Sequence, residues 1–465
     1  MWAIATLFHQ LGFRRVAETP LETVVSAVAL WVLARPNSRV AFTALLSMQI
    51  AEIAVRAPVV SNHWWTTAFV ALVVLTARIS SDREASVSAT VARAAPALRW
   101  ILLAVYFWGV FHKLNRDFLD PQLSCGVELY TALRRDYLPW LPDGGGPRAF
   151  AMYGTLIVET AIPLLLIFRR SRAFGILLGV GFHFFLGFVP YSVYYNFSSM
   201  LFVLYFLFAT PGWFETGLRR LEQRRATAWI ARAWAAHRRR PWVVVVAIAA
   251  FCVASALGDS AQRDTWRFLP RIPWTLYGGG LLLVFAANFG RTPNPSELEH
   301  ARRFVRFRGA PWVAYVLAGL YWLNGASPYL GLKTETSLAM YSNLRTEAGR
   351  SNHYLVAEPL DLFGWQNDIV HVRKTADPKL RGQTRGGFAL TWFEFRDRVA
   401  RTPGQAISYE REQIPAGGGE AAKAERGVLD DSKSDPRFRE PEPMWRRKLV
   451  YFRPVDMRDR QRCLH

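Results

Sequence analysis

Cysteine is scarce in this chain: three cysteines in 465 residues are too few for a disulfide-dense secreted scaffold. The sequence has no Gly-x-y period, which excludes a collagen-like rod. Only 20% of the residues are charged and 51% are hydrophobic, so most of the chain cannot stay solvated and disordered. Acidic residues are outnumbered, 36 against 57 Lys and Arg, which gives a net charge of +21. A soluble protein of this charge would suggest a nucleic-acid binder, and the position of the charges decides against that class.

Charged residues are nearly absent from a series of windows of roughly 15–20 residues, about the length that a helix needs to cross a bilayer. These windows alternate with Arg-rich connectors, which favours a membrane protein over the alternative, a large soluble helical protein. We therefore expect a mainly α protein, a polytopic transmembrane bundle of about ten helices. The windows are 21–34, 40–55, 64–77, 97–112, 150–168, 173–190, 196–211, 241–257, 269–289 and 310–325.

Three regions of different composition divide the chain. Residues 1–20 lack a clean apolar core and a cleavage site, so we expect an interfacial N-terminal segment and no cleavable signal peptide. Residues 21–325 form the expected transmembrane domain. Residues 326–465 contain short alternating runs, 368–373 and 448–452, that are typical of strands with one buried face. We expect a small C-terminal α+β domain there.

The Arg-rich connectors indicate the orientation. Segments 169–172, 212–240 and 290–309 concentrate arginine, and cytoplasmic loops concentrate Lys and Arg. We therefore expect a multi-pass protein of the cytoplasmic (inner) membrane, with 113–149 and the C-terminal domain extracytoplasmic. Membrane lipids are expected partners and nucleic acid is not. The side of the N-terminus stays open, because Arg flanks both ends of the first window.

An ionisable residue inside a membrane span is costly and therefore indicates function. The candidates are Lys113, at the end of the fourth window, with Glu159 and His183 inside the fifth and sixth. The run Asn62-His63-Trp64-Trp65 joins them at the start of the third window. Each also has a structural interpretation. Lys113 could extend to the interface, His63 could be an interfacial anchor and Asn62 a helix N-cap, and Glu159 and His183 could satisfy each other.

Together these residues predict a chemistry. An amine in a membrane-buried pocket loses solvation, and a neutral amine is a competent general base. The aromatic side chains near Lys113 and Trp64 suit a flat, lipid-soluble ring.

Two motifs then resemble a known family. The Asn62–Trp65 element resembles the Asn-His-aromatic-aromatic element of vitamin K-dependent γ-carboxylase, and residues 109–118 resemble its Gly-Val-x-Lys-Leu-x-x-Asp-aromatic element. The wider bacterial group is the HTTM-domain membrane proteins, and the resemblance covers roughly residues 10–325. It implies that Lys113 and His63 are catalytic, and that Lys113 deprotonates a reduced quinone of the vitamin K or menaquinol kind. The ring would be held by Asn62, Trp64, Trp65, His183 and Glu159.

In the carboxylase the quinol anion reacts with O2, the alkoxide formed removes a γ-proton from a peptide glutamate, and CO2 adds. A peptide or protein substrate on the extracytoplasmic side is implied. The tail departs from the carboxylases, and segment 342–354 is similar to bacterial HTTM proteins instead. The quinol half of the reaction is therefore better supported than the glutamate half.

Two alternatives stay open: a non-enzymatic membrane scaffold or lipid-binding protein, and another quinone-linked membrane oxidoreductase. No metal is expected, because the sequence has no Cys-x-x-Cys-His or HExxH motif. The sequence does not indicate an oligomeric state. Cys125 and Cys463 both fall outside the membrane, where oxidation occurs, and a bridge between them is one arrangement that the sequence leaves open.

Overall fold

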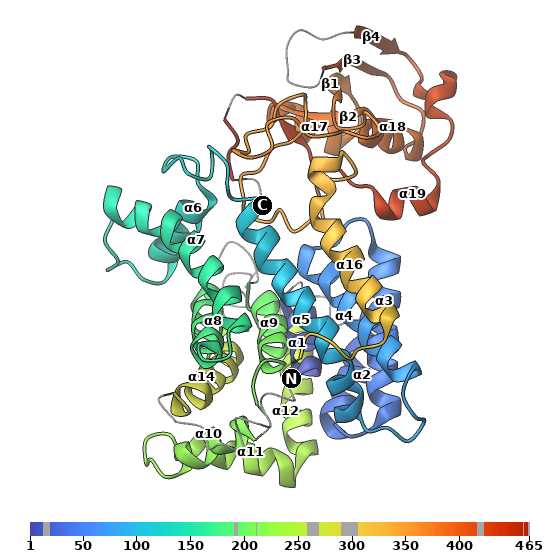
Figure 1. Ribbon diagram of the computed structural model, residues 1–465. Helices are drawn as coiled ribbons and strands as arrows, with labels where there is room; N and C mark the ends of the chain where they lie inside the picture. The colour runs from blue at the N-terminus through green and yellow to red at the C-terminus, as the bar shows by residue number, and fades with distance from the viewer. Residues whose placement is uncertain are drawn as a thin grey trace.

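The computed structural model describes residues 1–12, 19–189, 194–210, 212–257, 269–289, 306–415, 423–458 and 460–463. The chain is mainly helical, with a small antiparallel sheet at one end of a helical bundle (Figure 1). Every low-charge window contains a helix, so the helical character of these windows is confirmed. The helices are α2 (Pro20–Ala34), α3 (Arg39–Arg56), α4 (Asn62–Ile79), α5 (Val87–Phe111), α7 (Gly145–Ile167), α8 (Arg172–Leu186), α9 (Tyr194–Phe206), α12 (Pro241–Leu257), α14 (Arg271–Ala287) and α16 (Trp312–Ala326).

Local sequence accounts for where several helices begin. Ser38 and Ser86 precede α3 and α5, and each side-chain oxygen accepts a hydrogen bond from a backbone N–H of the first turn. Two described helices, α5 and α7, are long and apolar enough to cross a membrane, with mean hydropathies of 1.5 and 1.8. Helices α2, α8 and the stretch Pro241–Ala254 are apolar but shorter. Length and composition alone are therefore weak evidence for the larger number of spans.

The first helix is buried in protein. Helix α1 (Trp2–Gly12) packs against α9 and α2, and its residues from Ala5 to Leu11 are all buried. Polar contacts fix it to α3, because Gln10 Nε2 donates to Glu52 Oε1 at 2.8 Å and Glu52 is 1% exposed. Helix α1 is thus covered by other helices of the chain. The interfacial position of residues 1–20 stays a prediction, and residues 13–18 lie outside the described chain.

Helix α5 runs through the main hydrophobic core, which also contains side chains of α4, α9 and α14. Its buried Arg99 is satisfied by backbone carbonyls, with Nε donating to the Leu207 oxygen at 2.9 Å. The Arg-rich connector between α9 and α12 forms two short helices, α10 (Trp213–Glu222) and α11 (Ala228–Arg239). They lie at the end of the bundle opposite the sheet (Figure 1). The second long connector, 290–305, lies outside the described residues.

The C-terminal region contains the expected α+β elements. Its sheet has the order β4-β3-β1-β2-β5 with antiparallel pairing throughout. The run predicted at 368–373 is confirmed as part of β1. The strands are β1 (Asp368–Thr375), β2 (Phe388–Thr391), β3 (Ile407–Gln413), β4 (Lys423–Leu429) and β5 (Val455–Asp456); the helices are α17 (Pro378–Arg385), α18 (Trp392–Arg401) and α19 (Met444–Leu449), with 3-10 turns at Ser327–Leu330, Ser432–Ser434 and Pro436–Phe438.

The strand predicted at 448–452 is wrong. Lys448 and Leu449 end α19, and residues 450–452 form no strand. The backbone there bonds outside the sheet: the Tyr451 carbonyl accepts from the N–H groups of Thr334 and Glu335, and the Phe452 N–H donates to Glu394 Oε1. The alternating pattern of this run therefore does not lead to a strand, because its backbone groups bond to segments far away in the chain.

Candidate functional site

Lys113 forms a buried ion pair with Glu159. Lys113 follows the last turn of α5, and its Nζ lies 2.7 Å from Glu159 Oε2 on α7. The same amine donates to the Gly109 carbonyl at 3.0 Å. The two side chains expose only 7% and 16% of their surface. The distance places the Glu159 carboxylate in direct hydrogen-bonding contact with the Lys113 amine, close enough to exchange a proton with it.

His183 is hydrogen-bonded to the hydroxyl group of a tyrosine, in a cluster that lies beside this pair. Its Nε2 lies 2.9 Å from Tyr106 Oη, and the Tyr106 hydroxyl also bonds Tyr205 Oη. The three side chains come from α8, α5 and α9 and are buried. His183 Nδ1 has no partner among the described residues. The interpretation in which His183 and Glu159 satisfy each other is therefore wrong, because each bonds a different residue.

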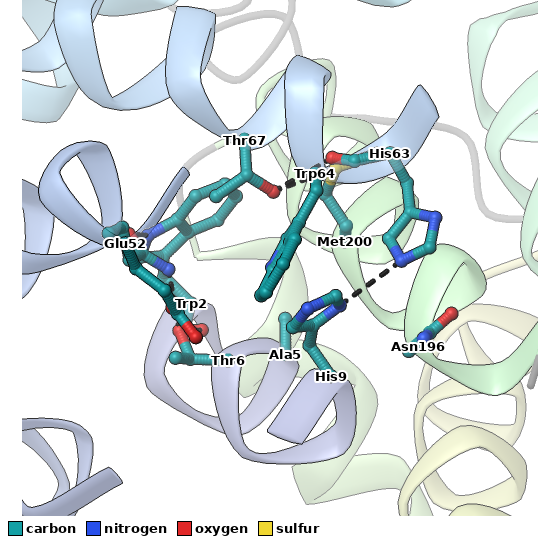
Figure 2. A pocket seen from close by; sticks show the side chains of 11 residues that line it. Trp2, Ala5, Thr6, His9, Glu52, His63, Trp64, Thr67, Asn196 and Met200 are labelled. Carbon is teal, nitrogen blue, oxygen red and sulfur yellow. Dashed lines mark hydrogen bonds between the residues drawn. The ribbon is translucent and has the colours of Figure 1, made fainter. Parts of the chain in front are cut away.

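His63 is paired with a histidine of the N-terminal helix. His63 Nε2 lies 3.1 Å from His9 Nδ1, and the His9 ring lies 4.0 Å from the ring centroid of Trp64 (Figure 2). Both histidines are buried, with exposures of 5% for His9 and 6% for His63. His63 is thus a buried, hydrogen-bonded side chain and not an interfacial anchor.

A small cavity lies beside these two histidines. Its volume is about 20 Å³, which is enough for one water molecule and too small for an aromatic ring. Figure 2 shows its walls, which include His9, Glu52, His63, Trp64 and Asn196. In this arrangement the cavity does not fit a quinone.

Asn62 and Trp65 face the C-terminal region. Ser61, not Asn62, is the N-cap residue of α4, so the N-cap expectation is corrected. The Asn62 side chain instead accepts a hydrogen bond from the Leu338 N–H at 2.6 Å. Trp65 contacts the same segment, because the amine of Lys333 lies 4.6 Å from the centroid of its ring.

The predicted residues therefore form two neighbouring groups. Lys113 and Glu159 lie near Tyr106 and His183, while His63 and Trp64 lie near His9. Phe197 of α9 connects the two groups, since its ring centroid is 5.5 Å from that of His183 and 6.1 Å from that of His63. Asn62 and Trp65 belong to neither group.

Residues of the C-terminal region also reach the end of α5, and none of them was among the predicted site residues. We call residues 331–353 the tail strap. Its Ser337 carbonyl lies 3.1 Å from His112 Nε2, and its Ser342 carbonyl accepts from Asn115 Nδ2 at 2.6 Å. His353 Nε2 lies 2.8 Å from the carbonyl of Phe111. The density of Asn and Ser in segment 342–353 was a signal of such contacts, because short polar side chains bond backbone groups readily.

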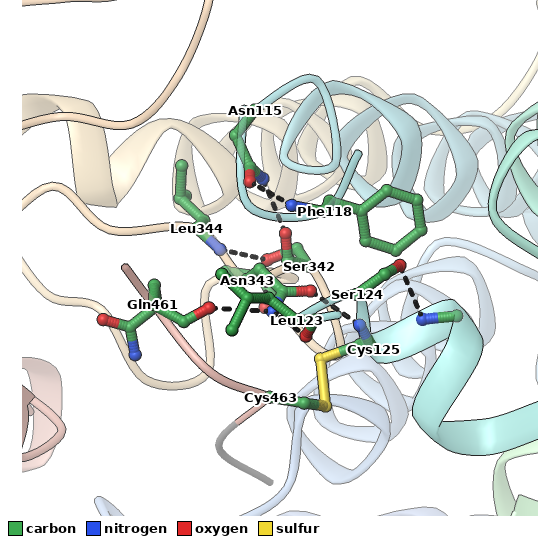
Figure 3. The surroundings of a disulfide bond; sticks show 12 residues. Asn115, Phe118, Leu123, Ser124, Cys125, Ser342, Asn343, Leu344, Gln461 and Cys463 are labelled. Carbon is green, nitrogen blue, oxygen red and sulfur yellow. Dashed lines mark hydrogen bonds between the residues drawn. A yellow bond between two sulfur atoms is a disulfide. The ribbon is translucent and has the colours of Figure 1, made fainter. Parts of the chain in front are cut away.

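A disulfide fastens the end of the chain to the same place. Cys125, at the start of α6 (Cys125–Asp136), is bonded to Cys463 (Figure 3). Asn343 of the tail strap joins both segments, since its Oδ1 accepts from the Cys125 N–H and its Nδ2 donates to the Gln461 carbonyl. The bridge that the sequence left open is therefore present. The loop after α5, the tail strap and the C-terminus form one buried polar junction.

Among the residues that the structure describes, no three His, Cys, Asp or Glu side chains are grouped so as to hold a metal ion. Comparison of the chain with protein-family models, with curated proteins and with solved structures finds no match.

Proposed function

We propose that this chain is a polytopic enzyme of the cytoplasmic membrane, similar to the vitamin K-dependent γ-carboxylases, in which Lys113 deprotonates a reduced quinone. The Lys113–Glu159 pair carries the proposal, because it places a titratable amine and its proton acceptor 2.7 Å apart in a buried position. Paired acid–base groups in buried positions are typical of proton-transfer sites. The resemblance of the 109–118 element assigns the base to the same lysine.

The proposed topology has about ten spans with the C-terminal domain extracytoplasmic. Two observations support it. Each low-charge window is helical, and the Arg-rich helices α10 and α11 lie at the end of the bundle opposite the sheet (Figure 1). On this topology the junction around Cys125 and Cys463 faces an oxidising compartment, where a disulfide persists.

The quinol is a substrate, and its ring would approach Lys113 from the lipid side of α7. The cavity at His63 is too small, whereas α7 has only 17% of its apolar window buried and Glu159 keeps 16% exposure. The resemblance places all the predicted residues around one quinone ring, whereas here we assign them two different roles. Glu159 and His183 would lie near the ring, and His63, Asn62, Trp64 and Trp65 would position α1, α4 and the tail strap.

The residues perform the proton transfer in two steps. Glu159 Oε2 takes a proton from the Lys113 ammonium, which leaves a neutral amine that accepts the quinol O–H proton. The hydrogen-bonded side chains of Tyr106, His183 and Tyr205 lie beside this site. Reaction of the quinol anion with O2, and addition of CO2 to a peptide glutamate, remain the expected later steps.

The test measures quinone epoxide formation and CO2 incorporation in membranes that contain wild type, Lys113→Ala or Glu159→Gln, supplied with menaquinol or reduced vitamin K and a glutamate-containing peptide. We expect no turnover with Lys113→Ala and a strong reduction with Glu159→Gln. Lys379→Ala, which removes an exposed lysine of α17, is the matched control. Quinol oxidation that depends on Lys113 without CO2 incorporation would indicate the other quinone-linked oxidoreductase. Absence of any Lys113-dependent turnover would contradict the proposal.

One observation favours a second candidate, a membrane scaffold that uses its C-terminal region to hold a partner. The tail is locked to the bundle by the disulfide and by the buried bonds of Asn343. This function predicts that Lys113→Ala and His63→Ala leave partner binding intact, and that deletion of residues 340–465 abolishes it.

A further inference from the structure

The C-terminal region exposes large apolar side chains close to the ends of the bundle helices. Each exposes more than half of its surface, and they lie in the segment 354–363 and on α19. Single exposed apolar side chains are normal, but a gathering of this kind marks a surface that another body covers. We call these side chains the apolar rim: Leu355, Leu360, Leu362, Phe363, Trp445 and Leu449.

The segment 354–363 is fixed at the end of α16. The Leu360 N–H donates to the Tyr329 carbonyl at 2.8 Å, and the Leu362 N–H donates to the Leu330 carbonyl at 3.1 Å. Both carbonyls belong to the 3-10 turn that directly follows α16. These bonds hold the apolar side chains of the segment just beyond the last turn of that helix.

Helix α16 presents an apolar stripe that leads to this point. Val316, Leu320 and Leu323 lie on one face of the helix at i, i+4 and i+7, and each exposes about half of its surface. In the proposed topology this stripe faces lipid. Leu323 lies in the last turn, so the segment 354–363 extends the lipid-facing surface past the end of the helix.

Helix α19 is fixed at the end of another bundle helix, α3. Lys448 Nζ donates to the carbonyls of Val55 and Ala57 at 2.7 and 2.6 Å. These residues lie at the C-terminal end of α3, and α19 lies on the side of the sheet that faces the bundle (Figure 1). The two parts of the apolar rim are therefore placed at the same end of the bundle.

The two faces of α19 have different surroundings. Trp445 and Leu449 are one turn apart on the same side of the helix as Lys448, and they are exposed. Arg447 is two positions from each of them, about 200° away around the helix, and its Nη1 donates to Glu394 of α18 at 2.8 Å. One face of α19 thus binds the C-terminal domain, and the opposite face is apolar and uncovered by the described residues.

We propose that the apolar rim docks the C-terminal domain on the outer leaflet of the membrane, with its side chains at the boundary between headgroups and acyl chains. A helix with an apolar face and basic residues lies in this plane, and Trp is enriched at this level. The continuity of the rim with the α16 stripe favours lipid over a protein partner as the body that covers it. The inference rests on the membrane topology of the proposed function, because it requires the ends of α3 and α16 to lie at the bilayer surface.

The test measures the surroundings of spin labels on the full chain in nanodiscs. Cys252 is buried and Cys125 is bonded to Cys463, so an introduced cysteine is the exposed thiol, and labelling of wild type gives the background. Labels at Leu362→Cys and Leu449→Cys report on the rim. Val428→Cys, at an exposed position of β4, is the water control, and Leu320→Cys of α16 is the lipid control. Collision rates with O2, which concentrates in lipid, are compared with those of a nickel chelate, which stays in water.

We expect the ratio of O2 to nickel collisions at both rim positions to exceed the ratio at Val428→Cys several-fold, and to lie below that at Leu320→Cys. Ratios equal to that of Val428→Cys at both rim positions, with a lipid-like ratio at Leu320→Cys, would overturn this inference and leave the proposed topology standing. A water-like ratio at Leu320→Cys would contradict the topology itself. Low collision rates with both reagents at the rim would show that protein covers it, which also overturns docking on lipid.

Discussion

Replacing Lys333 with Met should stabilise the protein at acidic pH and lose that advantage as the pH rises. Burial lowers the pKa of Lys333 from 10.5 to about 7, and this residue is 6% exposed. At about 1.4 kcal/mol for each pH unit, the interval corresponds to about 5 kcal/mol of folding free energy. Below pH 7 the amine is charged in the folded and unfolded states, so the folded protein bears the full desolvation cost.

The pH window follows from the direction of the shift. Between pH 7 and 10.5 the folded state holds a neutral amine while the unfolded state still binds a proton, so wild-type stability rises with pH. Above 10.5 both states are neutral and the cost disappears. The methionine variant never has this cost. It does lose the hydrogen bond to Thr336 and the contact with the Trp65 ring, together about 1–2 kcal/mol.

The net expectation is that Lys333→Met is more stable than wild type by about 3 kcal/mol at pH 6 and slightly less stable near pH 10. The assay is thermal and denaturant-induced unfolding of the purified full chain in detergent at pH 6, 8 and 10. Lys379→Met serves as the control for loss of an exposed lysine. A Lys333→Met variant that is destabilised by the same amount at all three pH values would refute the reasoning.

Three further predictions concern other contacts. Cys463→Ser removes the bridge to Cys125, which closes a long loop, and should lower the free energy of unfolding by about 2–5 kcal/mol. The variant should also expose the C-terminus to carboxypeptidase digestion. An unchanged digestion rate would show that the polar junction holds the C-terminus without the disulfide. Asn352→Ala leaves the buried Asp117 carboxylate without the donor that lies 2.7 Å away and should cost about 1–3 kcal/mol, measured by the shift in the unfolding midpoint. Phe395→Ala empties a fully buried position of the C-terminal core and should cost about 3–5 kcal/mol; limited proteolysis should then cleave within 360–460 while α5 stays protected.

The helices could be predicted because their signal is local. Each low-charge window is long enough to make a helix the favoured structure, and each contains one. The run at 368–373 was read correctly because its alternation matches the period of a strand, as β1 confirms. The run at 448–452 has the same alternation and forms no strand, because its backbone bonds to the tail strap and to Glu394.

The partners of the candidate residues could not be predicted, because each contact joins residues far apart in the chain. Lys113 and Glu159 are 46 positions apart, His9 and His63 are 54 apart, and Asn62 and Leu338 are 276 apart. Residue type indicated that these polar side chains were unusual in apolar surroundings. It did not indicate which residue each of them would bond.

The sequence by itself determined the helical windows and the position of the α+β region, and it singled out Lys113 and His183 as polar side chains in apolar surroundings, because hydropathy and periodicity are properties of short segments. Only the tertiary structure decided that Lys113 is ion-paired, that α1 is packed against α2 and α9, and that the tail strap places a second amine against Trp65. The physical reason is that hydrogen bonds and ion pairs act over a few ångströms, and only the packed chain brings these groups within that range.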